Sequence, residues 1–274
     1  MTTLEAILLA LTEGVTEFLP ISSTAHMIFL SSIFGISQDE FVKMFQVSIQ
    51  LGAILAVVFL YWRKFFDFKS KQFYFKLFLA VIPALVLGKL FDDKIEAVLE
   101  KPIPIAITLV IGGVVLLFID RLFKNPHINQ EENIGILPAI KIGIWQCLAM
   151  MPGTSRAAAS IIGGMQQGLN RKTAAEFSFF LAVPTMLAVT TYSLFLKDWN
   201  YHGVEQSGIK MIFSSSNNTM LFFLGNIVAF IVAIISIKFF MGIISKYGFK
   251  IWGYYRIAAG IILLLLIFTG QIKS

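Results

Sequence analysis

Two carboxylates lie close together in the first apolar region of the chain. Glu13 and Glu17 are four residues apart in the run Glu13-Gly-Val-Thr-Glu-Phe-Leu-Pro-Ile-Ser-Ser-Thr-Ala-His26. At this spacing two helical residues share a face, and like charges there repel. Either one carboxyl is protonated or a cation sits between them. Mg²⁺ or Ca²⁺ suits such a pair, with water and phosphate oxygens completing its shell. The apolar flanks argue against an ordinary aqueous surface near a helix end.

Three hydroxyls and a histidine follow the carboxylates. Pro20 ends the first helix, and Ser22, Ser23 and Thr24 are candidate N-caps for the next. His26 follows Ser23 by three residues, so the two share a helix face. A hydroxyl beside a histidine at a helix N-terminus forms a nucleophile-and-base arrangement. Capping alone would explain at least one hydroxyl, and many histidines are structural. The position of this histidine in an apolar segment, near two carboxylates, favours a function.

A second polar break, Pro152-Gly-Thr-Ser-Arg156, lies in the middle of the chain. Gly153 permits a close turn, and Thr154 or Ser155 can cap the helix that follows. The free N–H groups of a helix start form an anion site. Arg156 adds a planar fork matched to phosphate oxygens. Its pairing with one of the glutamates in the resting state would be compatible with phosphate binding in the working state.

Together these groups suit phosphoryl transfer, because a cation and an arginine would neutralise charge beside a nucleophile and a base. The same groups suit an inverted-repeat secondary transporter or flippase that moves a phosphorylated lipid or an anion. Arg256, in the last apolar segment, is expected to pair with Glu176 or to cap backbone carbonyls, and we assign it no chemistry.

The composition indicates which elements position these groups. The 274 residues are 57% hydrophobic and 14% charged, with a mean hydropathy of +0.79. A soluble domain carries about a quarter charged residues. The chain is therefore predicted to be a single all-α polytopic membrane domain. Basic cytoplasmic loops explain the net charge of +6 better than nucleic-acid binding does. The single Cys147 excludes a disulfide framework. Nothing in the sequence specifies an oligomeric state.

Hydrophobic segments divide the chain into six spans and two broken helix pairs. The broken pairs surround Pro20 and Pro152, and each half is too short to cross a bilayer. They are expected to be re-entrant. The predicted spans are 41–62, 73–90, 102–122, 174–196, 220–240 and 251–268, and the connections 92–101 and 197–218 are predicted to be loops.

The second half of the chain repeats the first. An ungapped alignment places Pro20 on Pro152 and Ser23 on Ser155, which gives one repeat at about 4–124 and another at about 136–270. Three spans per repeat would invert the halves in the bilayer. If the basic connection after the first span is cytoplasmic, 13 of the 22 Lys and Arg residues lie inside and 6 outside. This balance favours external termini if both broken pairs are re-entrant.

The two motifs closely resemble those of the bacterial undecaprenyl pyrophosphate phosphatase family, also called the bacitracin-resistance proteins. Segments 45–52, 163–165 and 176–184 are also similar, and the resemblance runs from about residue 5 to 268. It implies an enzyme of the bacterial cytoplasmic membrane that hydrolyses undecaprenyl pyrophosphate to the monophosphate and inorganic phosphate, recycling the lipid carrier of cell-wall polymers. It also implies dependence on a divalent cation, inverted repeats with re-entrant segments, and a site open to the lipid and to the external face.

The resemblance also implies roles for single residues. Glu13 and Glu17 would hold the cation or polarise the attacking group. Ser23 would be the nucleophile or a phosphate ligand with His26 as general base, or the histidine would attack. Where the family commonly has serine and threonine after the arginine, this chain has Ala157 and Ser160, and only the second can still donate a hydrogen bond. The residues expected to bind the substrate phosphates are Ser22, Thr24, Gly153, Thr154, Ser155, Arg156 and Ser160.

Overall fold

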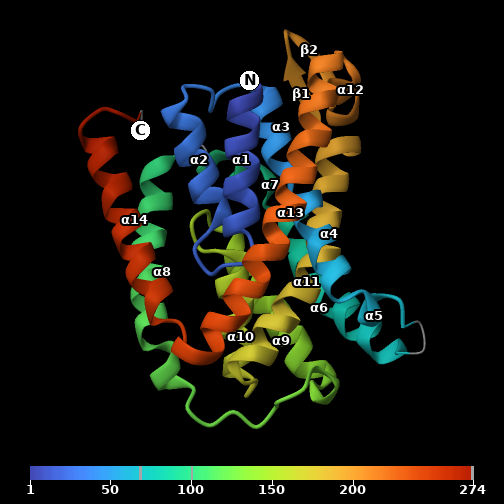
Figure 1. Cartoon of the computed structure of the whole chain (residues 1–274), viewed down its shortest axis with the longest axis vertical. Coiled ribbons are helices and arrows are strands. Elements are labelled where there is room, and N and C mark those ends of the chain that lie inside the picture. The colour runs from blue at the N-terminus through green and yellow to red at the C-terminus, as the bar shows by residue number, and fades with distance from the viewer. Residues whose placement is uncertain (68–69, 100, 273–274) are drawn as a thin grey trace.

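The computed structural model describes residues 1–67, 70–99 and 101–272 (Figure 1). Lys69 and Lys273, which enter the charge balance above, lie outside the described residues. Within the described part, six helical segments are long and apolar enough to cross a membrane, which confirms a multi-pass helical membrane protein. These segments are Glu40–Leu60, Lys71–Leu90, Pro102–Leu122, Arg171–Leu196, Ser216–Tyr247 and Lys250–Phe268.

The helices of the first half are α1 (Thr3–Thr16), α2 (Ser23–Ile33), α3 (Glu40–Ser48), α4 (Gln50–Leu60), α5 (Trp62–Phe65), α6 (Lys71–Leu90), α7 (Asp92–Leu99) and α8 (Pro102–Leu122). Those of the second half are η1 (Glu131–Asn133), α9 (Ile136–Gln146), η2 (Cys147–Met150), α10 (Arg156–Gln166), α11 (Arg171–Thr191), the π-helical η3 (Tyr192–Leu196), α12 (Gly208–Phe213), α13 (Ser216–Tyr247) and α14 (Lys250–Phe268). Strands β1 (Asp198–Tyr201) and β2 (Val204–Ser207) precede α12.

Two connections that were predicted to be loops carry regular structure. The connection 92–101 contains α7, and 197–218 contains an antiparallel β1–β2 hairpin followed by α12, so the fold is not purely helical. The hairpin turns at His202 and Gly203, whose φ angles of 54° and 79° match the tight turns that join adjacent strands. Buried Trp199 anchors it by donating a 2.9 Å hydrogen bond to the carbonyl of Ser193.

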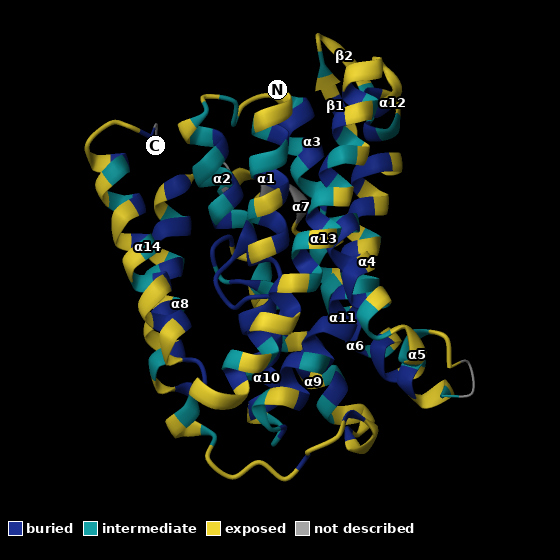
Figure 2. Cartoon of the chain, viewed as in Figure 1, coloured by how far each residue is buried: buried dark blue, intermediate teal, exposed yellow. Residues whose placement is uncertain are grey.

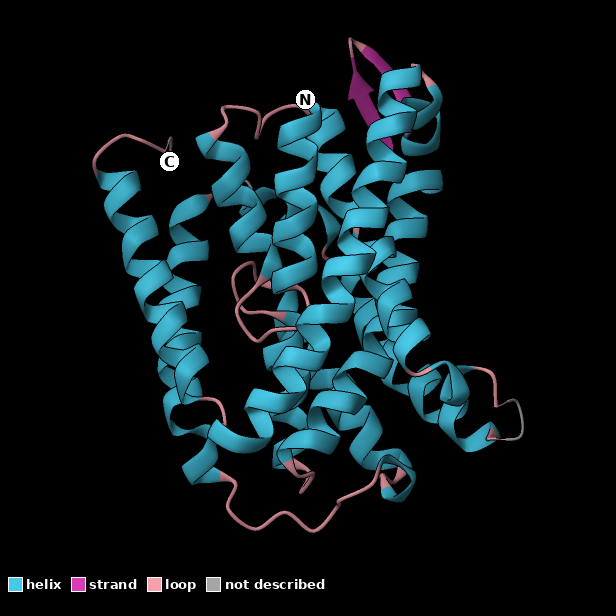
Figure 3. Cartoon of the chain, in the orientation of Figure 1, coloured by secondary structure: helices cyan, strands magenta, loops and turns pink. Residues whose placement is uncertain are grey.

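The two broken helix pairs are built alike. Helices α1 and α2 have 14 and 11 residues, and α9 and α10 have 11 each, too few to cross a bilayer. The loop within each pair lies near the middle of the long axis of the molecule (Figures 1 and 3). Ser22 caps α2 and Ser155 caps α10, with φ angles of 71° and 73°. Such angles are strained for a serine, so the surroundings must hold both loops in place.

The positions of the two caps shift the alignment of the two halves of the chain by one residue at these loops. The structure equates Ser22 with Ser155, whereas the alignment pairs Ser23 with Ser155. The difference arises because the second loop has one more residue between its proline and its cap. Ser23 and Arg156 are therefore equivalent, since each is the first residue of its helix.

The first loop is buried, and the spanning helices expose apolar side chains. Residues 16–23 are all buried, so the first loop lies in the protein interior (Figure 2). Phe18 in this loop packs edge-on against Phe179 of α11, with ring centroids 5.3 Å apart. Large apolar side chains are exposed on the spanning helices, for example Phe78 and Phe118. Apolar exteriors of this kind face lipid in a membrane protein.

Candidate active site

The two loops meet inside the protein. The hydroxyl of Ser155, at the start of α10, lies 3.5 Å from the carbonyl of Leu19 in the first loop. The two polar motifs, more than a hundred residues apart in sequence, therefore lie next to each other in space, as the sequence predicted. Both loops precede helix starts whose first N–H groups have no partner within the helix.

Glu17 joins the two motifs. The hydroxyl of Ser23 donates a hydrogen bond to Oε2 of Glu17, and Nη2 of Arg156 donates to Oε1 at 3.0 Å. Glu17 is 7% exposed and the Arg156 side chain 12%. Hydrogen bonds to an ionised group are about twice as strong as neutral ones. One buried carboxylate thus orients a hydroxyl from the first motif and a guanidinium from the second.

Further contacts hold the plane of the Arg156 guanidinium, including one of 3.8 Å from Nη2 to the sulfur of Met186. Nη1 donates to the carbonyl of Ser178 at 2.9 Å and to its hydroxyl at 3.3 Å. The ring of Phe18 lies 5.7 Å from the guanidinium carbon. Nε is buried and has no hydrogen-bond partner. Ser178 was not among the predicted site residues, and only the resemblance of segment 176–184 pointed to it.

The side chain of Ser160 contacts the backbone of its own helix and Ser178. Its buried hydroxyl donates to the carbonyl of Arg156 at 2.8 Å and lies 2.7 Å from the hydroxyl of Ser178. In this structure the hydroxyl of Ser160 bonds back to the preceding turn. Its binding of a substrate phosphate stays a prediction. Ala157 is fully buried, so it contributes nothing to the surface of the site.

His26 is not paired with Ser23. Its Nδ1 lies 2.7 Å from the carbonyl of Ser22, and its Nε2 lies 2.7 Å from the hydroxyl of Tyr255, whose ring is stacked on the imidazole. A carbonyl only accepts, so Nδ1 carries a proton. When the ring is neutral, Nε2 therefore accepts from the hydroxyl of Tyr255. Side chains of a helix lean toward its N-terminus, and from the first position of α2 Ser23 reaches Glu17. The predicted serine–histidine pair is thus replaced by a serine–glutamate pair.

Glu13 completes the acidic group. It is 1% exposed, its Oε1 is buried without a partner, and its carboxyl lies close enough to that of Glu17 to hydrogen-bond. Across the described residues, no group of three or more His, Cys, Asp or Glu side chains could hold a metal on its own. Two carboxylates fit a hard cation that takes its other ligands from water and phosphate.

The remaining predicted residues shape the second loop and the helix starts. Gly153 has a φ of 87°, and a Cβ there would lie 2.5 Å from the carbonyl of Ile105, so only glycine fits. The carbonyls of Gly153 and Thr154 both accept hydrogen bonds from Arg256. Of the two partners expected for this arginine, Glu176 or backbone carbonyls, the structure shows the carbonyls. Thr24 is half-buried in the first turn of α2.

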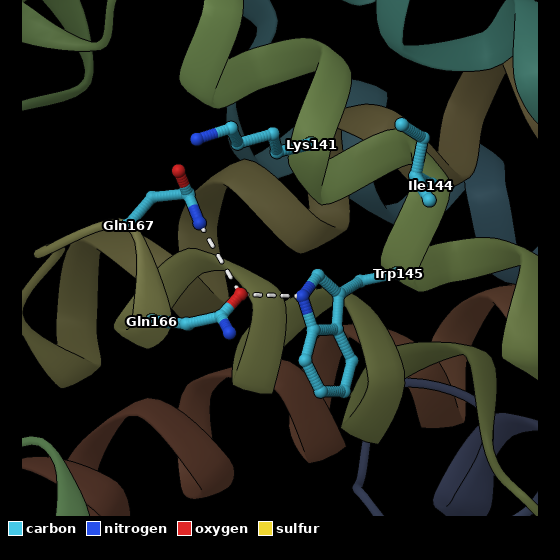
Figure 4. A pocket seen from close by; sticks show the side chains of 5 residues that line it. All are labelled: Lys141, Ile144, Trp145, Gln166 and Gln167. Carbon is cyan, nitrogen blue, oxygen red and sulfur yellow. Dashed lines mark hydrogen bonds between the residues drawn. The ribbon is translucent and has the colours of Figure 1, made fainter.

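A separate cavity of about 400 Å³ lies between α9 and α10 (Figure 4). In it Trp145 and Gln167 both donate to the side-chain oxygen of Gln166, at 2.6 and 3.3 Å. Lys141 and Ile144 also line it, and none of the predicted site residues does. The chemistry of the two motifs is therefore not located in this cavity.

Comparison with known proteins identifies the family. The model of the family described as "Bacitracin resistance protein BacA" matches residues 6–262. Proteins named undecaprenyl-diphosphatase are similar over nearly their whole length. The one from Flavobacterium johnsoniae is 52% identical over 269 residues, 98% of this chain and 97% of the relative. Those from Porphyromonas gingivalis and Campylobacter jejuni are 45% and 43% identical, over 98% and 100% of this chain and 98% of each relative. The chain belongs to the bacitracin resistance protein BacA family.

Proposed function

We propose that this protein hydrolyses undecaprenyl pyrophosphate to undecaprenyl phosphate and inorganic phosphate, and so recycles the lipid carrier of cell-wall polymers. The names of the relatives support this substrate. The single observation that carries the proposal is the buried Glu17, which accepts hydrogen bonds from Ser23 and Arg156 at once. A hydroxyl, a base for its proton and a cationic fork for phosphate are the parts that phosphoryl transfer requires.

In the proposed reaction the oxygen of Ser23 attacks the terminal phosphorus. A bond forms between Oγ and phosphorus, the bond from phosphorus to the bridging oxygen breaks, and undecaprenyl phosphate leaves with that oxygen. Glu17 accepts the proton of Ser23, to which it is already hydrogen-bonded. Glu17 passes this proton to the departing undecaprenyl phosphate. The oxygen of a water molecule then bonds to phosphorus and the bond between Oγ and phosphorus breaks. Oγ takes up the proton that the water loses, and inorganic phosphate leaves. His26 is assigned no part in the attack, because both its ring nitrogens bond elsewhere.

The phosphate oxygens would be bound by Arg156 and by the helix starts. The unpartnered Nε–H of Arg156 supports this role, and the guanidinium can exchange its contact with Glu17 for the substrate. The first N–H groups of α2 and α10, in the regions of Ser22–Thr24 and Gly153–Ser155, would add donors and the positive ends of two helix dipoles.

A divalent cation, Mg²⁺ or Ca²⁺, would be held by Glu13 and Glu17. The unpartnered Oε1 of Glu13 and the closeness of the two carboxyls support this. When bound, the cation would neutralise charge on the pyrophosphate. The cation would also offset the charges of both carboxylates, so that they do not repel the anionic substrate.

The placement in the membrane is part of the proposal. The halves are two inverted repeats with re-entrant pairs α1–α2 and α9–α10, in the bacterial cytoplasmic membrane. The equivalent caps Ser22 and Ser155 support the repeat. Both chain ends lie at the end of the molecule that carries the β1–β2 hairpin, and the segment 123–135 lies at the opposite end (Figure 1). With the charge balance, this supports external termini and a site open to the external face.

The test is phosphate release from undecaprenyl pyrophosphate by purified protein in detergent. We expect stoichiometric undecaprenyl phosphate and inorganic phosphate, and loss of both with a chelator. Reconstitution in liposomes separates hydrolysis from transport. Movement of intact pyrophosphate across the bilayer without phosphate release would contradict the proposal.

A further inference from the structure

Arg256 of α14 is a buried cation that the proposed reaction does not use. It is 0% exposed, and its guanidinium donates hydrogen bonds to five backbone carbonyls. Nε donates to Leu109 at 3.3 Å. Nη1 donates to Pro20 at 3.1 Å and Thr154 at 2.9 Å, and Nη2 to Thr108 at 3.2 Å and Gly153 at 2.7 Å. A guanidinium has five N–H donors, and five carbonyls accept here. A charged group at membrane depth is costly and by default functional.

The five carbonyls come from three parts of the fold. Pro20 lies in the first loop, Gly153 and Thr154 lie in the second, and Thr108 and Leu109 lie in the spanning helix α8. Arg256 therefore ties both loops to each other and to two membrane-spanning helices.

The bonded carbonyls of the two loops lie two or three residues before Ser23 and Arg156 in the sequence. Pro20 precedes Ser23 by three residues, and Thr154 precedes Arg156 by two. All described peptide bonds are trans, so the N–H that follows each carbonyl points the opposite way. A carbonyl of Thr154 held by Arg256 thus turns the N–H of Ser155 away from Arg256.

We propose that Arg256 is a positioning residue that sets the spacing and orientation of Ser23 relative to Arg156. The inference rests on the proposed function, because it concerns the geometry of that reaction. The strained caps Ser22 and Ser155 require an external restraint, and Arg256 supplies one to the residues preceding each. A displacement of about 1 Å in a catalytic constellation can cost about 100-fold in rate.

Two variants disturb the restraint in different ways. Arg256→Lys keeps the charge but replaces the five-donor fork with a single ammonium. Gly112→Ala keeps the arginine and displaces it, because a Cβ at this position of α8 would lie 2.2 Å from Nη2. Gly253→Ala is the matched control. Its Cβ would lie 2.8 Å from the carbonyl of Gly113, so it strains the same α8–α14 contact without touching the guanidinium.

The experiment measures kcat, KM and the thermal unfolding midpoint of the detergent-purified protein with undecaprenyl pyrophosphate. For Arg256→Lys and Gly112→Ala we expect kcat per folded molecule to fall about 100-fold, with a much smaller change in KM. Gly253→Ala should lower the midpoint and leave kcat within about threefold of the wild type, well below the loss that misplaced groups cause.

A purely structural role predicts the opposite. Arg256→Lys and Gly112→Ala would then lower the midpoint while kcat per folded molecule stayed at the wild-type value, and that result would overturn the inference. Equal losses of kcat in Gly112→Ala and Gly253→Ala would overturn it too, because general disturbance of α8 and α14 would explain both. Failure of the proposed function is distinguishable, since the wild-type protein itself would then release no phosphate.

Discussion

Replacing Glu17 with glutamine tests which group accepts the proton of Ser23. The carboxylate of Glu17 accepts from Ser23 on one oxygen and from Arg156 on the other. Glutamine has nearly the same shape but only one oxygen acceptor, and its NH₂ group would face one of the two donors. His26→Gln is the matched comparison, since that side chain bonds Ser22 and Tyr255 instead.

The expected loss follows from these contacts. General-base catalysis contributes about 10²–10⁴-fold, and a hydrogen bond to a charged group about 1.5–3 kcal/mol. Glu17→Gln loses the base and weakens the hold on Arg156, so we expect kcat to fall about 10³-fold, which corresponds to about 4 kcal/mol. His26→Gln removes a contact beside the site and none to Ser23, and we expect a fall of about tenfold or less, below the range for loss of a base.

The assay is single-turnover phosphate release, measured by rapid quench and normalised to the folded fraction from thermal unfolding. Normalisation matters because Glu17 is buried and its loss leaves Arg156 without its carboxylate partner. The reasoning is refuted if His26→Gln shows the thousandfold loss while Glu17→Gln stays within tenfold of the wild type.

Three further predictions concern the arginine of the site and the ion pairs beside α5. Arg156→Lys keeps the charge but loses the planar fork, so kcat/KM for phosphate release should fall by about 100-fold or more. An unchanged kcat/KM would contradict the binding of phosphate by Arg156. Lys64→Met removes the ion-pair partner that lies 2.5 Å from Glu131, whose side chain is only 7% exposed. The free energy of unfolding, measured by thermal unfolding, should fall by about 1–3 kcal/mol, whereas the control Lys71→Met should change it little. The hydrogen bond from Lys64 lowers the pKa of Glu132 below 4.5. The ionised Glu132 therefore stabilises the fold fully above about pH 4.5, and this stabilisation is lost as the pH falls through the pKa of the folded state. Glu132→Gln should lower the thermal unfolding midpoint at neutral pH, and should leave it unchanged below that pKa.

The spans were predictable because lipid imposes length and composition on them. The segment 102–122 coincides with α8, and 251–268 differs from α14 by one residue. The 197–218 connection was missed, because a turn at His202–Gly203 and a single buried Trp199 are weak signals beside long apolar runs. Helix α13 runs past its predicted span, since apolarity marks the lipid-facing part of a helix and not its end.

The sequence predicted which residues meet at the candidate site better than it predicted the hydrogen bonds between them. Charged residues in apolar segments identified Glu13, Glu17 and Arg156, because such residues are rare at membrane depth. Helical spacing suggested that Ser23 pairs with His26, but spacing within one helix cannot show that Glu17, in the preceding loop, lies closer. The backbone carbonyls that bind Arg256 carry no sequence signal, since any residue supplies one.

Phosphate release by Ser23→Ala tests the central claim most directly. The variant removes one oxygen and leaves the ion pair of Glu17 with Arg156 in place. Wild-type protein and variant are compared on undecaprenyl pyrophosphate in the same detergent with the same divalent cation. We expect steady phosphate release from the wild type and at least a 10³-fold lower rate from an equally folded variant, as for loss of a nucleophile. Equal rates in the two proteins would contradict hydrolysis at this site.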